Sequence, residues 1–270
     1  MYYFNEFRQF LFHLFSNYKL IITLTKNDFK KQYFGSYFGL FWAFAQPIVF
    51  ILVIWFVFDV GLRGSPNTDE GTPFFLWLIS GMIPWFFFAN GLNSGTNAII
   101  SNSFLVKKVA FRTSILPLVQ IGSALMIHLV LVTLLVLAFI LYGFHPSLYW
   151  LQVFYYLFCS VFLLLGLTWL TSSIRVFVKD IGNFINIVIQ IGFWATPIFW
   201  SLDLVPQHYR YIIELNPMFY IIEGFRDTFI NHIWFWEKGL TVYFLLFTSI
   251  FFVLGAIVFR KLRIHFGDVL

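Results

Sequence analysis

The chain has 270 residues, of which 60% are apolar and only 11% are charged, and its formal net charge is +5. So little charge excludes an ordinary soluble domain of this size, and the long apolar runs predict a single integral membrane domain over residues 1–270. The single cysteine, Cys159, excludes an internal disulfide and a cysteine metal cluster, and no metal site is expected.

The N-terminal region, residues 1–32, is too polar to cross a membrane but has apolar residues at helical spacing from Phe4 to Tyr18. This pattern predicts an amphipathic helix that lies along the inner headgroup region. Lys26, Lys30 and Lys31 would then face lipid phosphates. An ordinary cytoplasmic helix is the alternative.

Six apolar segments follow, each close to the roughly 20 residues that cross a hydrocarbon core of ~30 Å. They cover residues 35–60, 73–98, 115–141, 149–173, 181–200 and 238–259. The predicted fold class is therefore an all-α integral membrane protein with six transmembrane helices.

The charges are unevenly divided between the two sides of this topology. One side carries thirteen of the 17 Lys and Arg residues and four acidic residues, a net charge of +9, whereas the other carries four and eight, a net charge of −4. Because Lys and Arg favour the cytoplasmic side, we expect a multi-pass protein of the cytoplasmic (inner) membrane with both termini in the cytoplasm. The net positive charge then reflects loops near anionic lipid, not binding of nucleic acid.

Two connections depart from a simple series of spans. The inner segment 99–114 has helix-forming content and predicts a short helix held crosswise beneath the membrane. The outer segment 201–237 is apolar but too short and too charged for two more spans. Pro206 can open a helix there, and Asn216-Pro217 interrupts the segment as a turn. We expect two half-helices that dip into the outer leaflet, which requires that protein or a water-filled cavity cover them.

Polar amides form stripes on two spans. Asn90, Asn93 and Asn97 recur at helical spacing on the second span, and Asn183, Asn186 and Gln190 do so on the fifth. Amides facing lipid are costly, so these stripes should point inward. They either line a hydrated conduit or provide hydrogen bonds between helices, which contribute about 0.6 kcal/mol each on average.

Aromatic residues make up 23% of the chain, and one tight cluster lies at the cytoplasmic half of the first span. It includes Phe34, Tyr37, Phe38, Phe41 and Trp42. Aromatic faces stack on sugar rings without requiring a fixed pattern of hydroxyls, so this cluster is a candidate wall for a sliding glycan. Packing in the protein core is the alternative for each residue.

Motifs of catalysis are missing from the sequence. It contains no GxxxxGK[ST] phosphate loop, no HExxH and no GxSxG, and no pair of acidic residues is clustered on the inner side. His128 lies near the middle of the third span without ionisable companions, so we interpret it as a neutral, hydrogen-bonded histidine. A proton- or sodium-driven transporter and a membrane enzyme acting on polyprenyl substrates are therefore alternatives with weak support.

Five stretches together resemble the membrane subunit of type-2 ABC exporters for lipid-linked polysaccharides, a family that moves O-antigens, capsules or teichoic acids. The similarity runs from about residue 20 to near the end of the chain. The stretches are KKQYFGSYFGLFWAFAQPI (30–48), SGMIPWFFFANGL (80–92), VFVKDIGNF (176–184), FWATPIFW (193–200) and LNPMFYIIEGFRD (215–227).

The resemblance implies that two copies of this chain pair with two copies of a separate ABC ATPase subunit. ATP and Mg²⁺ would bind in that partner, and no cofactor is expected in this chain. The region near 20–32 resembles the family's interface helix. Segment 99–114 resembles the coupling helix, which would bring Lys107, Lys108, Phe111 and Arg112 near the ATPase. The hairpin 201–235 resembles the gate helices that cap the exit, and it implicates Trp200, Asn216, Pro217 and Glu223.

From the resemblance we expect a lipid anchor to enter from the inner leaflet near Lys26, Lys30 and Lys31, which would bind its pyrophosphate. The glycan would then follow the aromatic and amide-lined interior. A type-2 ABC exporter of drugs or small lipids is the main alternative. The motifs do not distinguish O-antigen from teichoic acid or capsule, because members share the membrane core across different polymers.

Overall fold

The computed structural model describes residues 18–34, 38–61, 71–107 and 112–270, and these residues form helices and connecting loops with no strand. Five helices are long and apolar enough to cross a membrane. They are α3 (Gly39–Trp55, continued by the π-helical turn Phe56–Gly61), α4 (Phe74–Ser101), α6 (Ile115–Leu141), α7 (Gln152–Arg175) and α11 (Leu240–Leu262). The shorter helices are α2 (Tyr18–Tyr33), α5 (Ser103–Val106), α8 (Ile181–Ala195), α9 (Gln207–Glu214), α10 (Pro217–Arg226) and α12 (Phe266–Val269). The prediction of an all-α integral membrane protein is confirmed.

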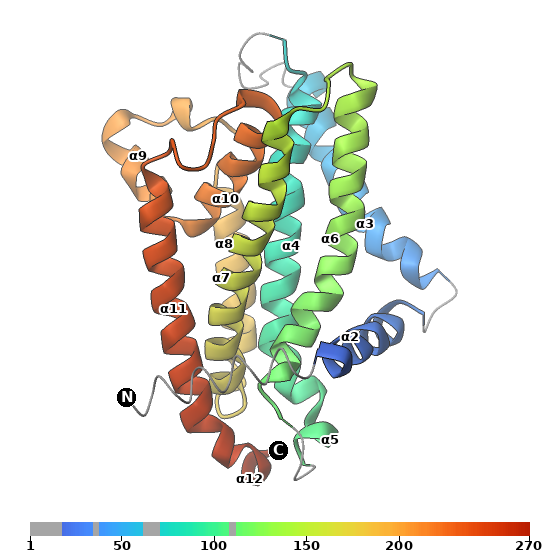
Figure 1. Ribbon diagram of the computed structural model, residues 1–270, viewed down its shortest axis with the longest axis vertical. Coiled ribbons are helices and arrows are strands. Elements are labelled where there is room, and N and C mark those ends of the chain that lie inside the picture. Colours follow the sequence, from blue (N-terminus) through green and yellow to red (C-terminus); the bar gives the residue numbers. More distant parts are fainter. Residues whose placement is uncertain (1–17, 35–37, 62–70, 108–111) are drawn as a thin grey trace.

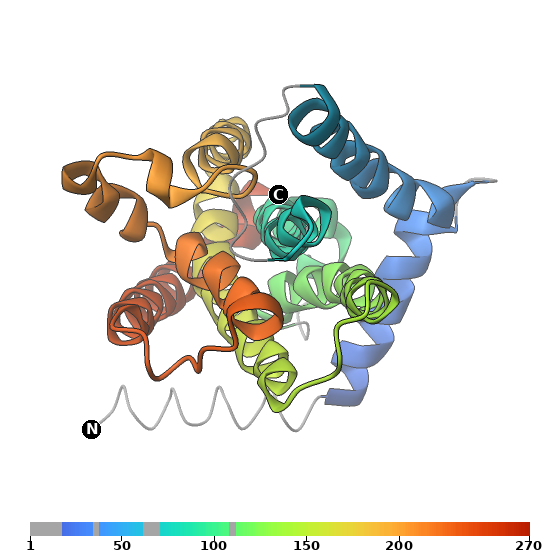
Figure 2. The ribbon, with the colours of Figure 1, turned by 90° about the horizontal axis from the view of Figure 1, so that it is seen from above.

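Helix α4 forms the centre of the bundle, with α6, α7, α8 and α10 around it (Figure 2). Of the 18 consecutive residues of α4 that are most apolar, 72% are buried. For α3, which lies at the periphery, the corresponding fraction is 11%. Glycines permit the closest packing: a Cβ at Gly95 would clash with Thr168 of α7, and a Cβ at Gly255 of α11 would lie 2.2 Å from the carbonyl oxygen of Gly166. Small residues at helix contacts are typical of membrane bundles, where they let backbones approach.

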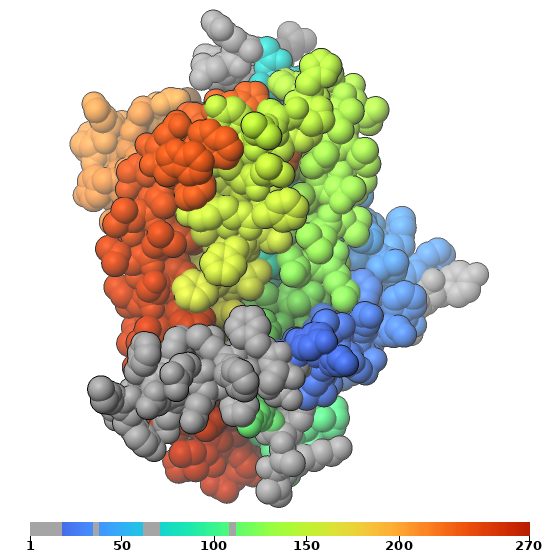
Figure 3. Space-filling model, in the orientation of Figure 1, coloured from blue at the N-terminus to red at the C-terminus, as the bar shows by residue number. Residues whose placement is uncertain are grey.

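One side of the bundle is formed by α11, α7 and α6, which stand side by side (Figures 1 and 3). Large apolar side chains of these helices are exposed, including Phe154 and Phe158 of α7 and Leu246 and Ile250 of α11. An apolar surface along a helix long enough to span a membrane is the surface expected to face lipid.

The two ends of the bundle differ in charge. Helices α4, α7 and α11 end, and α6 begins, at the end drawn at the bottom of Figure 1, where Lys107, Arg112 and Arg175 lie. The opposite end carries α9 and α10 with Asp203, Glu214 and most of the other outer acids. Among the described residues, Lys107, Arg112 and Arg175 therefore lie at one end of the bundle, whereas Asp203 and Glu214 lie at the other.

Three predicted boundaries differ from the structure. The fifth span was expected over 181–200, but α8 ends at Ala195 and is about 22 Å long at 1.5 Å per residue, shorter than the other spans. The six-span count therefore stays a prediction. Helix α4 continues to Ser101, and the expected crosswise helix within 99–114 is described only as the four-residue α5. Helix α2 lies across the bundle axis (Figures 1 and 2), and residues 1–17 of the predicted N-terminal helix lie outside the described residues.

Candidate functional site

The two amide stripes meet between α4 and α8. The Asn93 side-chain amide donates a hydrogen bond to Oδ1 of Asn186. Asn97 Nδ2 in turn donates to the backbone oxygen and the side-chain oxygen of Asn93, at 2.9 and 3.0 Å. Asn93 and Asn97 are half-buried, whereas Asn186 is exposed. The two helix faces that carry the stripes therefore touch. The bond between Asn93 and Asn186 is a hydrogen bond between helices, one of the two roles considered for the amides.

The remaining amides of the stripes are exposed in the single chain. Asn183 and Gln190 lie on the same side of α8 as the large exposed side chains Phe184, Ile187 and Ile191. This side of α8 is therefore uncovered and of mixed polarity. Such a surface suits a protein or aqueous neighbour better than lipid, because an amide in hydrocarbon lacks a hydrogen-bond partner.

Helix α2 also contributes to this site. The Tyr33 side chain lies close to Asn90 of α4. Asp28 accepts hydrogen bonds from Gln120 Nε2 and Ser123 Oγ of α6, both at 2.7 Å. Ser123 and Gln120 are both buried, which makes the contact a fixed anchor. The predicted lipid-phosphate residues Lys26, Lys30 and Lys31 are all exposed on this anchored helix.

The aromatic cluster forms an exposed surface at the foot of α3. Phe34, Phe38, Phe41 and Trp42 are each 59–65% exposed. The ring centroids are 6.3 Å apart for Phe38 and Phe41 and 5.5 Å apart for Phe41 and Trp42, with edge-to-face geometry. Core packing within the single chain therefore does not account for these rings. Tyr37 lies outside the described residues.

Two of the four predicted ATPase-contact residues are described. Lys107 and Arg112 are exposed at the cationic end of the bundle, on either side of the gap at 108–111. Lys108 and Phe111 lie outside the described residues.

The outer hairpin has the two short helices expected from its prolines. Pro206 precedes α9, and Pro217 is the first residue of α10. Asn216 caps α10 by accepting a hydrogen bond from the Met218 amide at 3.0 Å. Its Nδ2 also donates to Thr196 Oγ1 at 2.7 Å, which connects the turn to the segment after α8. Trp200 ends that segment and donates from Nε1 to the Trp194 backbone at 3.2 Å.

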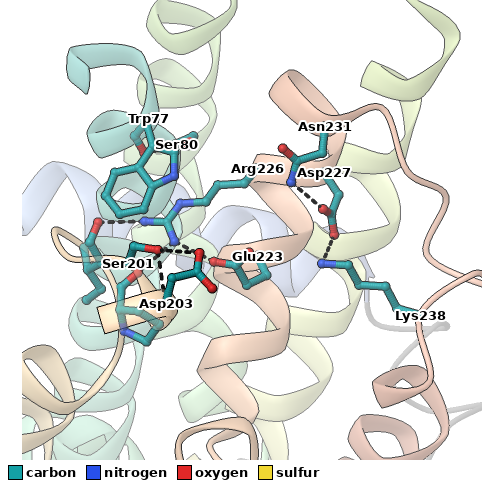
Figure 4. A network of polar contacts seen from close by, with 11 residues as sticks. Trp77, Ser80, Ser201, Asp203, Glu223, Arg226, Asp227, Asn231 and Lys238 are labelled. Carbon is teal, nitrogen blue, oxygen red and sulfur yellow. Dashed lines mark hydrogen bonds and ion pairs between the residues drawn. The ribbon is translucent and has the colours of Figure 1, made fainter. Parts of the chain in front are cut away.

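Arg226 makes the largest number of side-chain contacts in the hairpin, and it was not predicted from the sequence as a site residue (Figure 4). Its guanidinium is 2% exposed, pairs with Glu223, and donates to the backbone oxygens of Pro197 and Ile198, both at 2.8 Å. It also lies 3.5 Å from the ring centroid of Trp77 on α4. A buried cation needs such compensation. An ionisable residue in an apolar run with an acid three residues earlier was the signal available in the sequence.

A second ion pair follows Arg226 in the chain. Asp227 is 1% exposed, pairs with Lys238, and accepts a hydrogen bond from Asn231 Nδ2 at 2.9 Å. The backbone amide of Ile233 donates to the Asp227 carbonyl at 3.2 Å, so the same residue fixes the loop that leads to α11.

His128 is buried among aromatic rings. It stacks on Phe87 with ring centroids 4.6 Å apart and lies 6.1 Å from the ring of Phe225. These contacts agree with a structural histidine. Across the described ranges, no group of three or more His, Cys, Asp and Glu side chains could hold a metal ion.

The amino-acid sequence of the chain is similar to those of known proteins. Residues 19–230 match the family model described as ABC-2 type transporter. Two proteins of Klebsiella pneumoniae named O-antigen export system permease protein RfbA are 28% and 29% identical to this chain, and each alignment covers 93% of this chain and 95% of the relative. A protein of the same name from Myxococcus xanthus is 28% identical over 79% of this chain and 81% of its own length.

Proposed function

Because the chain belongs to the ABC-2 type transporter family, we propose that it is the membrane subunit of an ATP-driven exporter of lipid-linked polysaccharide, of the O-antigen or teichoic acid type. The proposed cargo is supported by relatives named for O-antigen export that align over nearly the whole chain. Family membership makes this chain the transport subunit. We propose that ATP and Mg²⁺ bind in a separate ABC ATPase partner, present in two copies.

In this proposal, a second copy of the chain covers the exposed faces of α3 and α8. Helices α3 and α8 expose apolar side chains such as Val49, Val53, Ile187 and Ile191 along lengths that a neighbour could cover. The amides on α8 favour protein over lipid as that neighbour. Two copies facing each other through α3 and α8 would enclose the amides between them.

The proposed orientation puts the cationic end of the bundle in the cytoplasm, with both termini there, in the inner membrane. Lys107 and Arg112 then lie where an ATPase can reach them, and α9 and α10 lie on the outer side. A lipid anchor would arrive from the inner leaflet beside α2.

The contact between Asn93 and Asn186 is the observation that carries the proposed path. It fixes α8 against α4 with its exposed amides turned away from the core, toward the place of the second copy. Amide groups both donate and accept hydrogen bonds, so they can exchange partners along a chain of sugar hydroxyls. The exposed rings at the foot of α3 would meet the glycan first, by stacking.

Lys30 and Lys31 provide the test of where the lipid phosphate binds. In the complex reconstituted with its ATPase, lipid-linked polysaccharide should stimulate ATP hydrolysis, and replacing both residues by Ala should reduce that stimulation severalfold. Lys19→Ala is the matched control, since Lys19 is also exposed but lies at the other end of α2.

The outcomes separate the parts of the proposal. Undiminished stimulation in the double variant refutes the phosphate site alone. Stimulation of the wild-type complex by small amphiphilic drugs, but not by lipid-linked polysaccharide, refutes the cargo.

A further inference from the structure

A buried segment without helical structure separates the proposed path from the outer hairpin. Residues Thr196 to Phe199 follow α8 directly and are buried, although Thr196 has an extended backbone with φ −89° and ψ 138°. Outside a helix, backbone carbonyls lose their regular partners, and in a buried, apolar setting each needs a replacement donor. The groups that donate hydrogen bonds to these carbonyls therefore fix the position of the segment.

The donors come from the hairpin. Arg226 of α10 donates one nitrogen to the carbonyl of Pro197 and another to the carbonyl of Ile198, both at 2.8 Å. Asn216, at the start of α10, donates to Thr196 Oγ1 at 2.7 Å. Helix α10 is thus bonded to the segment near both of its ends, and Figure 4 shows the end at Arg226.

The guanidinium of Arg226 suits this position better than the ammonium group of a lysine would. Its planar fork offers several fixed donors at once, and its face stacks on the Trp77 ring of α4. Gly81 leaves the necessary space, because a Cβ there would lie 2.9 Å from Arg226 Nη2 and 3.1 Å from the Ile198 oxygen. Three elements, α4, α10 and the segment after α8, therefore meet at one side chain.

We propose that Arg226 is a positioning residue that joins the end of α8 to the outer hairpin, so that the two move as one body during export. This inference rests on the proposed function, in which α8 lines the path and the hairpin covers its exit. When α8 moves as the two copies separate, the segment carries α10 and α9 with it. Opening at the outer side is then set by the position of α8 and needs no separate signal.

Distances between labels test the inference without any measurement of transport. Spin labels are attached to cysteines at Ala195, the last residue of α8, and at Tyr209 of α9, which are both exposed. The buried native cysteine is replaced in a Cys159→Ala background, and labelled chain is diluted with unlabelled chain so that a complex carries one labelled copy. In the wild-type complex, the distance should be the same without nucleotide and with ATP trapped. In Arg226→Lys it should become broad or change between the two states.

Coupling is measured on the same complexes in proteoliposomes as polysaccharide exported per ATP hydrolysed. Arg226→Met should lower this ratio at least tenfold while ATP hydrolysis continues, and Arg226→Lys should lower it less. Gly81→Ala keeps the arginine but crowds it, and should also lower the ratio. Arg210→Met is the matched control, because Arg210 of α9 bonds only the exposed Asp203 and nearby backbone of the same hairpin.

Each result decides the question. A wild-type label distance that changes between states overturns the one-body inference, as does an unchanged export ratio in both Arg226→Lys and Gly81→Ala. These two variants carry the test if Arg226→Met does not assemble. If wild-type complex moves no polysaccharide, the proposed function fails, whereas the label distances still decide whether α8 and the hairpin move together.

Discussion

Asp28 anchors α2 on α6, and removing its carboxylate tests how firmly the helix is held. Gln120 and Ser123 donate to different carboxylate oxygens, both at 2.7 Å. A hydrogen bond to a charged group contributes about 1.5–3 kcal/mol, so Asp28→Ala, which loses two, should weaken docking by at least ~3 kcal/mol. Since 1.4 kcal/mol corresponds to a factor of ten, the undocked population of α2 should rise about a hundredfold.

Hydrogen–deuterium exchange of the backbone amides of α2, in the complete complex in a bilayer, measures this change. A detached helix of 16 residues is only marginally stable, so undocking exposes its amides to exchange. We expect about hundredfold faster exchange in Asp28→Ala and a smaller effect in Asp28→Asn, which keeps one acceptor oxygen. Asn27→Ala, at an exposed neighbouring position, is the control. Wild-type exchange rates in Asp28→Ala would refute the anchor.

Three further predictions concern packing, path and topology. Gly255→Val should lower the yield and melting temperature of the complex, because the new Cβ meets the backbone of α7. Gly267→Val, where a Cβ has open space, should leave both unchanged. Asn186→Leu removes a hydrogen bond that contributes about 0.6 kcal/mol, so the melting temperature of the complex should change little. Export should slow severalfold because the amide is lost from the proposed path, and undiminished export would exclude this residue from the path. A cysteine at the exposed His145 should react with an impermeant maleimide outside intact cells, and reaction only after permeabilisation would reverse the topology.

Helix length was the part of the fold most accessible from sequence. The segment predicted at 115–141 coincides with α6, and the segment at 149–173 lies within η2 (Leu148–Leu151) and α7. Apolar runs locate such helices because the bilayer fixes the number of residues that must be apolar. Helix α2 is too polar to span, which is why it was expected to lie along the membrane surface, but its contacts with Gln120 and Ser123 of α6 could not be read from hydropathy.

Residues of the candidate site could be selected from the sequence where they form a periodic stripe on their own helix, and not where a single residue makes the contact. Asn93 and Asn186 were selected because each belongs to a periodic stripe. Asp28 was seen only as one of few inner acids, since its partners lie 92 and 95 residues further along. Periodicity gives the direction of a side chain from its own helix, but not the element that it meets.

The end of α8 and the burial of Arg226 have one physical cause. The apolar run 181–200 predicted a full span, but Pro197 disfavours helical backbone at Thr196, and the helix ends at Ala195. The chain continues as buried, non-helical backbone whose carbonyls at 197 and 198 need donors. Arg226 supplies them from α10, and its charge is balanced by Glu223 and the Trp77 ring. A proline that shortens one helix thus leaves carbonyl groups that a cation on another helix satisfies.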